Sequence, residues 1–180
     1  MLTCRVPRFA ALLVLAAAVL AGCTGSTSTP SPTPSVVSSS ASPTPTLSEG
    51  QKAANDVVVK YRALIDQLRQ QTPTDSTKLL TYARGSAYEK WRLVLQDDAV
   101  NDYRQVGVTS FTGRSTDPGA STLQWRVTGC LDGSKADVVD KAGKSTVTEP
   151  PTPHLVVYTV DQDTSTLRWY VTGDEATGSC

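Results

Sequence analysis

Residues 123–131 read Leu-Gln-Trp-Arg-Val-Thr-Gly-Cys-Leu, so apolar residues and Gly129 alternate with polar residues and Cys130. A period of two is typical of a half-buried strand that turns one apolar face toward a core. Turn-forming residues such as Asp, Gly and Pro separate this segment from other β-rich runs. We therefore expect an antiparallel meander whose other strands lie at 106–114, 138–139, 155–160 and 166–171.

Upstream of these strands the apolar period becomes helical. Ser48 and Gln51 have the spacing of a capping box, and apolar residues then recur at helical spacing up to Leu68. We expect a second helix over 75–84 and a third over 86–103, the latter starting with another capping box. Three N-terminal helices packed on one face of a curved antiparallel sheet make an α+β fold.

The first 22 residues have the order of a secretory signal peptide. Arg5 and Arg8 precede an apolar run over 9–20, which is shorter than the roughly 20 residues needed to cross a bilayer. The run ends in Leu-Ala-Gly-Cys at Cys23, which resembles a bacterial lipobox. This resemblance implies cleavage before Cys23 and a diacylglyceryl group on its sulfur, which would hold the chain on the extracytoplasmic face of the cell membrane. The alternative is an ordinary signal peptide with an incidental cysteine.

Residues 23–47 are expected to form the lipidated cysteine and a disordered tether. Positions 24–47 contain eight Ser, six Thr and five Pro and no charged residue. Such a segment has too little apolar surface to offset the entropy of ordering. Its composition also permits O-glycosylation. One globular domain is then expected over 48–180.

Charge and composition exclude several function classes. The 180 residues carry 17 basic and 17 acidic side chains, and removal of residues 1–22 leaves 15 basic and 17 acidic. A nearly neutral chain lacks the basic surface that nucleic-acid binding requires. The sequence contains no nucleotide-binding, nucleophile-elbow, metalloprotease or paired-cysteine metal motif. No cofactor, no metal and no catalytic residue is therefore assigned.

Two cysteines remain for the domain, because Cys4 leaves with the signal peptide and Cys23 carries lipid. Cys130 and Cys180 are expected to form a disulfide in an oxidising compartment. A metal-binding or catalytic thiol is the alternative, and His154 is the only histidine that could serve it.

The order of elements resembles the nuclear transport factor 2-like (NTF2-like), cystatin-like cone. The chain is most similar to small NTF2-like lipoproteins of high-GC Gram-positive (actinobacterial) bacteria and their phages. The segments that carry this resemblance are LAGC at 20–23, the Ser/Thr/Pro tether, 104–107, 130–132, 138–144 and the Trp169 to Cys180 ending. The resemblance implies a fold and a location but no particular activity.

Four aromatic residues are candidates for lining a pocket between helices and sheet: Tyr61, Tyr88, Trp91 and Tyr103. An aromatic lining with few polar groups suits a small apolar ligand. The alternative, which we favour, is that these side chains fill the core. Trp125 and Trp169 are expected to be core partners, with Leu167, Trp169 and Val171 on one face of the last strand.

Enzymatic members of the wide superfamily hold an Asp–His or Tyr–Asp pair at the mouth of the cone. Here His154 and Asp66 are the candidates, although a solvated histidine at a loop edge and a solvated helical aspartate are the simpler interpretations. Asp97, Asp98 and Asp102 are likewise expected to form a polar helix face rather than an acid–base pair.

The sequence therefore favours a lipid-anchored surface protein with a non-enzymatic binding or interaction domain. Its partner would be another envelope component, and exclusion of a superinfecting phage is one concrete form of that role. A small apolar ligand in the cone is the first alternative. A hydrolase or isomerase built on the cone is the second.

Overall fold

The computed structural model describes residues 47–71 and 74–180. The signal peptide, Cys23 and the tether up to residue 46 lie outside the described residues. Helix α1 (Glu49–Arg69) begins at the expected capping box. The Ser48 hydroxyl accepts a hydrogen bond from the Gln51 N–H, and the Gln51 side chain accepts one from the Ser48 N–H. Its buried apolar residues are Ala54, Val57, Val58, Tyr61, Ile65 and Leu68.

The second expected helix is only a short 3-10 helix, η1 (Ser76–Thr81). The Asp75 side chain accepts a hydrogen bond from the Thr77 N–H and starts this turn. The chain does not continue as a helix to residue 84, because residues 82–84 bond to the last strand, β6 (Trp169–Ser179), instead. The Arg84 N–H donates to the Val171 carbonyl, and the Val171 N–H donates to the Tyr82 carbonyl.

Helix α2 (Gly85–Val100) replaces the expected helix over 86–103. It begins after Arg84 without a side-chain cap, so the second capping box is not formed. The Ser86 hydroxyl donates to the Thr172 carbonyl instead, at 2.9 Å. The domain therefore has two α-helices and one 3-10 turn ahead of the strands, where three helices were expected.

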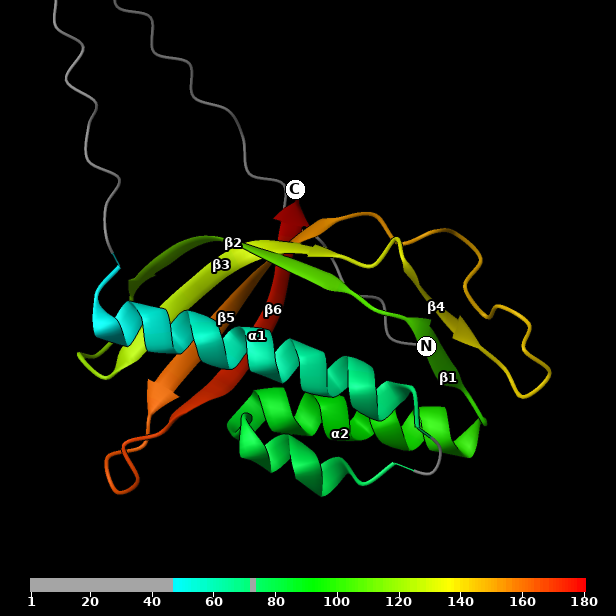
Figure 1. Cartoon of the computed structure of the whole chain (residues 1–180), viewed down its shortest axis with the longest axis horizontal. Helices are drawn as coiled ribbons and strands as arrows, with labels where there is room; N and C mark the ends of the chain where they lie inside the picture. The colour runs from blue at the N-terminus through cyan, green and yellow to red at the C-terminus, as the bar shows by residue number, and fades with distance from the viewer. Residues whose placement is uncertain (1–46, 72–73) are drawn as a thin grey trace, which may run out of the picture. The chain divides into compact units, whose positions relative to one another are not determined.

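The strands form two separate sheets (Figure 1). Strands β2 (Ser110–Pro118), β3 (Gln124–Asp132), β5 (His154–Gln162) and β6 (Trp169–Ser179) make an antiparallel sheet in the order β2-β3-β5-β6. Strands β1 (Arg104–Gly107) and β4 (Ala136–Val139) pair with each other. The prediction of a single strand over 106–114 is therefore wrong, because that segment is divided between two sheets. We call the β1–β4 pair the ribbon.

The predicted alternation is confirmed from Trp125 to Leu131, whereas Leu123 precedes β3 and is 38% exposed. Val127, Gly129 and Leu131 are buried in β3, and Arg126 on the opposite face is exposed. The last strand, however, starts at Trp169, because Leu167 lies in the preceding turn with φ +56° and is 70% exposed. Trp125 and Trp169 are both partly buried against the core cluster.

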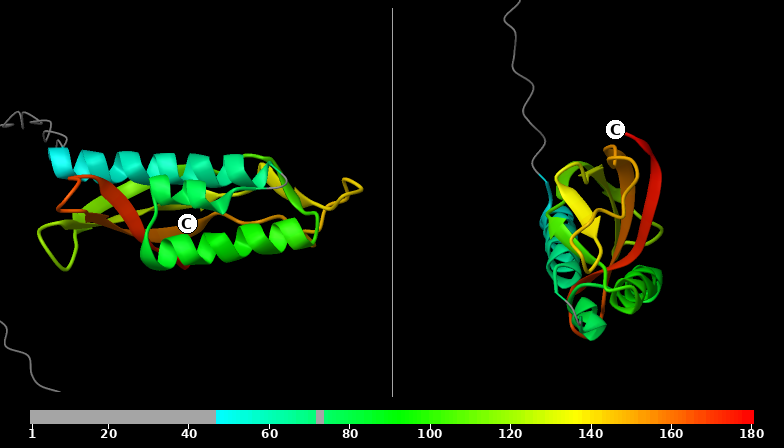
Figure 2. Two further views of the ribbon diagram at one scale, coloured as in Figure 1. Left: turned by 90° about the horizontal axis from the view of Figure 1, so that it is seen from below. Right: turned by 90° about the vertical axis from the view of Figure 1, so that its right-hand side faces the viewer.

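Both α-helices pack against the sheet, which curves around them. In the left view of Figure 2, α1 and α2 run along the strands, with strands visible between them. Register shifts between Gly113 and Ser115 in β2, and opposite β5 at Leu155/Val156 and Thr159/Val160, interrupt the regular ladder. Such irregularities bend and twist a sheet. The result is an α+β domain with a curved antiparallel sheet.

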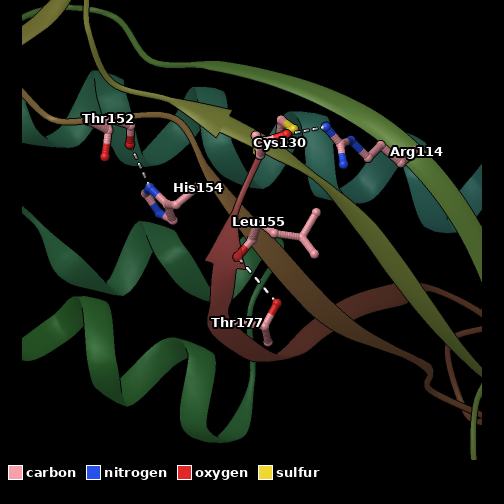
Figure 3. The surroundings of a disulfide bond; sticks show 7 residues. Arg114, Cys130, Thr152, His154, Leu155 and Thr177 are labelled. Carbon is pink, nitrogen blue, oxygen red and sulfur yellow. Dashed lines mark hydrogen bonds between the residues drawn. A yellow bond between two sulfur atoms is a disulfide. The ribbon is translucent and has the colours of Figure 1, made fainter.

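The expected disulfide is confirmed: Cys130 in β3 is bonded to Cys180, just past the end of β6 (Figure 3). Their Cα atoms lie 5.9 Å apart. Strand β5 separates β3 from β6, so the bond ties two strands that are not neighbours in the sheet. The Arg114 guanidinium donates to the Cys180 carbonyl and holds the same end. In 47–71 and 74–180, no helix is long and apolar enough to span a membrane.

Candidate functional site

A cavity of about 310 Å³ lies where α1, α2, the ribbon and the ends of β5 and β6 meet. It is partly open to solvent. Much of its wall is apolar, and the polar side chains come from several elements. The apolar lining consists of Trp91, Leu131, Ala136, Val138, Val147, Pro151, Val156 and Ala176. The charged lining consists of Arg62, Arg69, Lys90, Asp137 and Asp174, and His154 also lies in the wall.

Asp174 in β6 is one anchor of this wall. Its carboxylate accepts hydrogen bonds from the Tyr61 hydroxyl at 3.1 Å and from Trp91 Nε1 at 2.9 Å. Lys90 Nζ lies 3.2 Å from the other carboxylate oxygen and supplies the opposite charge. The Asp174 side chain is only 5% exposed. Burial, with the nearby Asp174 charge, raises the pKa of Tyr61 above its ordinary value, so Tyr61 remains a neutral donor.

Asp66 is a second anchor, and it is not the solvated residue expected from the sequence. It is 5% exposed and accepts hydrogen bonds from Gln105 Nε2 at 2.9 Å and from the Thr109 N–H at 2.8 Å. The Thr109 hydroxyl is also within 3.1 Å of both carboxylate oxygens. A carboxylate with this many donors is a fixed structural acceptor that ties the ribbon to α1.

Asp98 is also buried, at 7% exposure, where a polar helix face was expected. Arg69 binds it with two parallel contacts, Nε to Oδ2 at 2.8 Å and Nη2 to Oδ1 at 3.2 Å. Such a bidentate pair fixes both side chains. Asp97 and Asp102 remain exposed, as expected.

Arg62 differs from its charged neighbours because no described carboxylate lies within ion-pair distance of it. The residue is 5% exposed. One guanidinium nitrogen donates to the Thr109 hydroxyl at 3.4 Å, and the Trp91 ring centre lies 5.2 Å from its central carbon. Arg62 Nε is buried and has no hydrogen-bond partner. The hydroxyl of Tyr158 is the other buried side-chain atom without a partner in the described ranges.

Of the four aromatic candidates for a pocket lining, Trp91 alone lines this cavity. Tyr61 is fully buried in the core, where its ring meets Tyr158 edge-on at 6.1 Å between ring centres. Tyr88 packs against the core cluster from its edge. Tyr103 lies after α2 and bonds through its N–H to the Asp98 carbonyl. Tyr61 therefore fills the core, which agrees with the interpretation favoured from the sequence.

His154 and Asp66 are not brought together as an acid–base pair. The polar contact of His154 in the structure is Nδ1 to the Thr152 carbonyl at 3.4 Å (Figure 3). The Asp66 carboxylate is hydrogen-bonded to Gln105 and Thr109 and not to His154. Within 47–71 and 74–180, no group of three His, Cys, Asp or Glu side chains has the arrangement of a metal site.

Sequence reasoning missed Arg62 and Asp174. A signal for Arg62 was present, because it follows Tyr61 and stands four residues after Val58 on the buried stripe of α1. A charged residue at such a position needs an explanation. Asp174 had no comparable signal, since its partners on α1 and α2 come from more than 80 residues away.

A second cavity of about 350 Å³ lies on the other side of Arg62, between α1 and the start of β2. Arg62 and Thr109 line both cavities, and Asp66 lines only the second. The remaining residues of its wall are Val59, Ala63, Gln67, Gln70, Val108 and Phe111.

Comparison with known proteins supports the fold alone. No family model matches the chain, and no curated protein matches it. Among solved structures, the chain is similar to the intermembrane space region of the chloroplast protein ARC6, with 16% sequence identity and a TM-score of 0.58. The match covers 75% of this chain and all of that one.

Proposed function

We propose that this chain is a lipid-anchored, extracytoplasmic binding protein whose NTF2-like domain holds a small amphipathic molecule without reacting with it. In this proposal Cys23 carries the diacylglyceryl anchor, and the cavity beside Trp91 is the binding site. The anchor rests on the order of charge, apolar run and Leu-Ala-Gly-Cys. The origin in an actinobacterium or its phage rests on the same loose resemblance.

The observation that carries the binding role is the cavity itself. Its volume of about 310 Å³ is at the lower end of the range, roughly 300–1,000 Å³, found for small-molecule sites. It combines an apolar wall with a few convergent polar groups, which is the usual composition of such sites. The small-ligand alternative is therefore better supported than a flat protein-interaction surface.

Binding is also favoured over catalysis by the state of the acidic groups. Asp66 and Asp174 each accept hydrogen bonds from three donor groups of the chain, so both carboxylates are held in place by structural contacts. A general base needs reach to a substrate proton. The cavity thus offers shape and fixed polarity more than an acid–base pair.

The test is a titration with carbon-13-labelled octan-1-ol, a neutral amphiphile, followed by NMR. The full chain is processed in a bacterial host, its Cys23 peptide is weighed for the diacylglyceryl group, and the chain is placed in nanodiscs. We expect a saturable signal beyond that of empty nanodiscs. Ala136→Phe fills the cavity wall and should remove this signal, whereas Ala142→Phe, on an exposed turn, should keep it.

Two results would overturn the proposal. Absence of a saturable signal, or its equal loss in both variants, would contradict a site in this cavity. A Cys23 peptide without added lipid would contradict the anchor. Because the two variants sit in identical nanodiscs, octanol dissolved in the lipid cancels from their comparison.

A further inference from the structure

Arg62 is a buried cation without a direct ion pair among the described residues. Its nearest link to a carboxylate runs through the Thr109 hydroxyl, which contacts both Arg62 and Asp66. The other two cations of the cavity wall are paired: Arg69 with Asp98 and Lys90 with Asp174. Burial of a charge without a partner is costly, so buried arginines normally have a carboxylate beside them. Arg62 instead has one hydrogen bond of 3.4 Å and the face of Trp91. A stacked ring stabilises a guanidinium but does not satisfy its N–H groups.

The unsatisfied atoms are clustered. Arg62 Nε and the Tyr158 hydroxyl are both buried without partners. Burial raises the pKa of Tyr158, and the charge of Arg62 together with a weak polar contact between the two side chains opposes that rise. Neither Arg62 Nε nor the Tyr158 hydroxyl makes a hydrogen bond of regular geometry. Both groups can donate a hydrogen bond. An acceptor atom placed beside Arg62 would therefore satisfy groups that the folded chain leaves unpaired.

We infer that the cavity binds an amphipathic anion, a carboxylate on a short apolar body, with the carboxylate held by the Arg62 guanidinium. This rests on the proposed function, and it names the class of ligand. The carboxylate lies against Arg62, and the apolar body lies along Leu131, Val138 and Val156. A guanidinium is the side chain best suited to a carboxylate, because its planar donors match the two oxygens.

The remaining anions of the wall are already occupied. Asp174 faces Lys90, Trp91 and Tyr61, as described above. The Asp137 carboxylate accepts hydrogen bonds from the Val138 N–H at 2.7 Å and the Ser145 hydroxyl at 2.8 Å. Neither carboxylate is bonded to Arg62, so neither takes the place of the ligand.

Charge also selects between the two cavities that Arg62 lines. In the second cavity Asp66 balances Arg62, the one basic residue of its described wall, whereas in the first cavity Arg62, Arg69 and Lys90 outnumber Asp137 and Asp174. The first cavity contains Lys90 and Trp91 and has the larger set of apolar residues. We therefore place the anion in the first cavity.

The experiment compares three probes with the same chain length: octanoate, octan-1-ol and octylammonium, each titrated at pH 7 onto the full chain in nanodiscs. A hydrogen bond to a charged group is stronger than one between neutral groups, so we expect octanoate to bind at least about tenfold tighter than octan-1-ol. Octylammonium should bind more weakly than both, since its charge would oppose Arg62.

Arg62→Met tests the role of the guanidinium. This variant should lose the preference for octanoate and keep octan-1-ol binding. Its melting temperature should be unchanged or raised, because replacing a buried, unpaired charge by an apolar side chain of similar length removes a desolvation cost. Arg92→Met removes a charge outside the cavity wall and should leave all three affinities unchanged.

Each alternative has a distinct result. Equal affinity for octanoate and octan-1-ol would overturn the anion site and leave the binding function standing, with a buried water as the partner of Arg62. Absence of binding by every probe would overturn the proposed function itself. A lower melting temperature with loss of all binding in Arg62→Met would assign Arg62 to the fold and overturn its role in recognition.

Discussion

The four-stranded sheet and the ribbon are held in place by opposite kinds of contact. The sheet buries Val127, Val156 and Tyr158 against α1, so water exclusion stabilises it. In the ribbon, β1 turns Gln105 inward and leaves Val106 43% exposed. Gln105 reaches Asp66 on α1, and Gln70 of the same helix donates to the Gly107 carbonyl at 2.8 Å.

This difference matters because the cavity lies where the two regions meet. One wall belongs to the apolar sheet, and the other belongs to a ribbon of four residue pairs attached by polar contacts. Segments with few buried apolar contacts open at lower free energy than a core. We therefore expect the ribbon side to adapt to a ligand and the sheet side to stay fixed.

Removal of the disulfide should have the largest effect, and it acts on the sheet. Cys130 and Cys180 are 50 residues apart, and the loop-entropy model gives about 4 kcal/mol as an upper value for closing such a loop. Cys130→Ser and Cys180→Ser should therefore lower the free energy of unfolding by similar amounts in chemical denaturation. The double variant should match either single variant, since all three remove one bond.

Wild-type chain in reductant serves as the control and should behave as the double variant does. The ribbon should keep its amide protection in these variants, because neither cysteine lies in β1 or β4. Unequal single variants would show that one cysteine has a second role.

The apolar regions could be predicted from the sequence because a buried face places apolar residues at regular spacing along a strand or helix. The alternation over 123–131 predicted β3, and the stripe from Ala54 to Leu68 predicted α1 with its capping box. The predictions failed where polar contacts override that period. Residues 106–114 were predicted as one strand, but the chain pairs as β1 already from Arg104, with Gln105 buried because Asp66 offers it an acceptor, and only β2 joins the larger sheet.

The candidate site was predictable only in part, and for the same reason. Trp91 was one of four aromatic candidates for a pocket lining, for all of which core filling was the favoured interpretation, and it is the one that lines the cavity. Arg62 and Asp174 were missed because their meaning depends on partners distant in sequence. Asp66 stands off the apolar stripe of its helix, so the sequence predicts an exposed side chain. It is buried because Thr109, 43 residues later, donates its N–H to the carboxylate.

The next largest effect should come from Gly107→Ala, which strains the ribbon. Gly107 has φ +80°, a left-handed value that side chains rarely adopt, and an added Cβ would overlap the Lys135 carbonyl. Gly143 has the same φ with nothing within 4 Å of an added Cβ. Gly107→Ala should cost roughly 1–3 kcal/mol, and Gly143→Ala should cost about 1 kcal/mol for the backbone alone.

Amide hydrogen exchange distinguishes the two regions in this pair of variants. Gly107→Ala should speed exchange at the ribbon amides of Gln105 and Val139 and leave Val127 and Tyr158 protected. Octan-1-ol binding should weaken in the same variant, because the ribbon forms one wall of the cavity. Equal effects from the two alanines would show that φ, and not contact with Lys135, sets the cost.

The smallest effect should come from the turn between β5 and β6, which is held by polar contacts as the ribbon is. The Asp163 carboxylate accepts hydrogen bonds from the Ser165 hydroxyl at 2.6 Å and from the Ser165 and Thr166 N–H groups at 2.9 Å. These hydrogen bonds lower the pKa of Asp163 to about 2, and the bond from the Ser165 hydroxyl has the largest effect.

The pKa of Asp163 in the unfolded chain is about 3.9, so its contribution to stability is present above that pH and is lost as the pH falls toward 2. Amide exchange at Ser165 and Thr166 should therefore rise in this window in the wild-type chain and show no such pH dependence in Asp163→Asn. An Asp163 carboxyl that titrates near 4 by NMR would show that the turn is held by its backbone alone, and the likeness between this turn and the ribbon would fail.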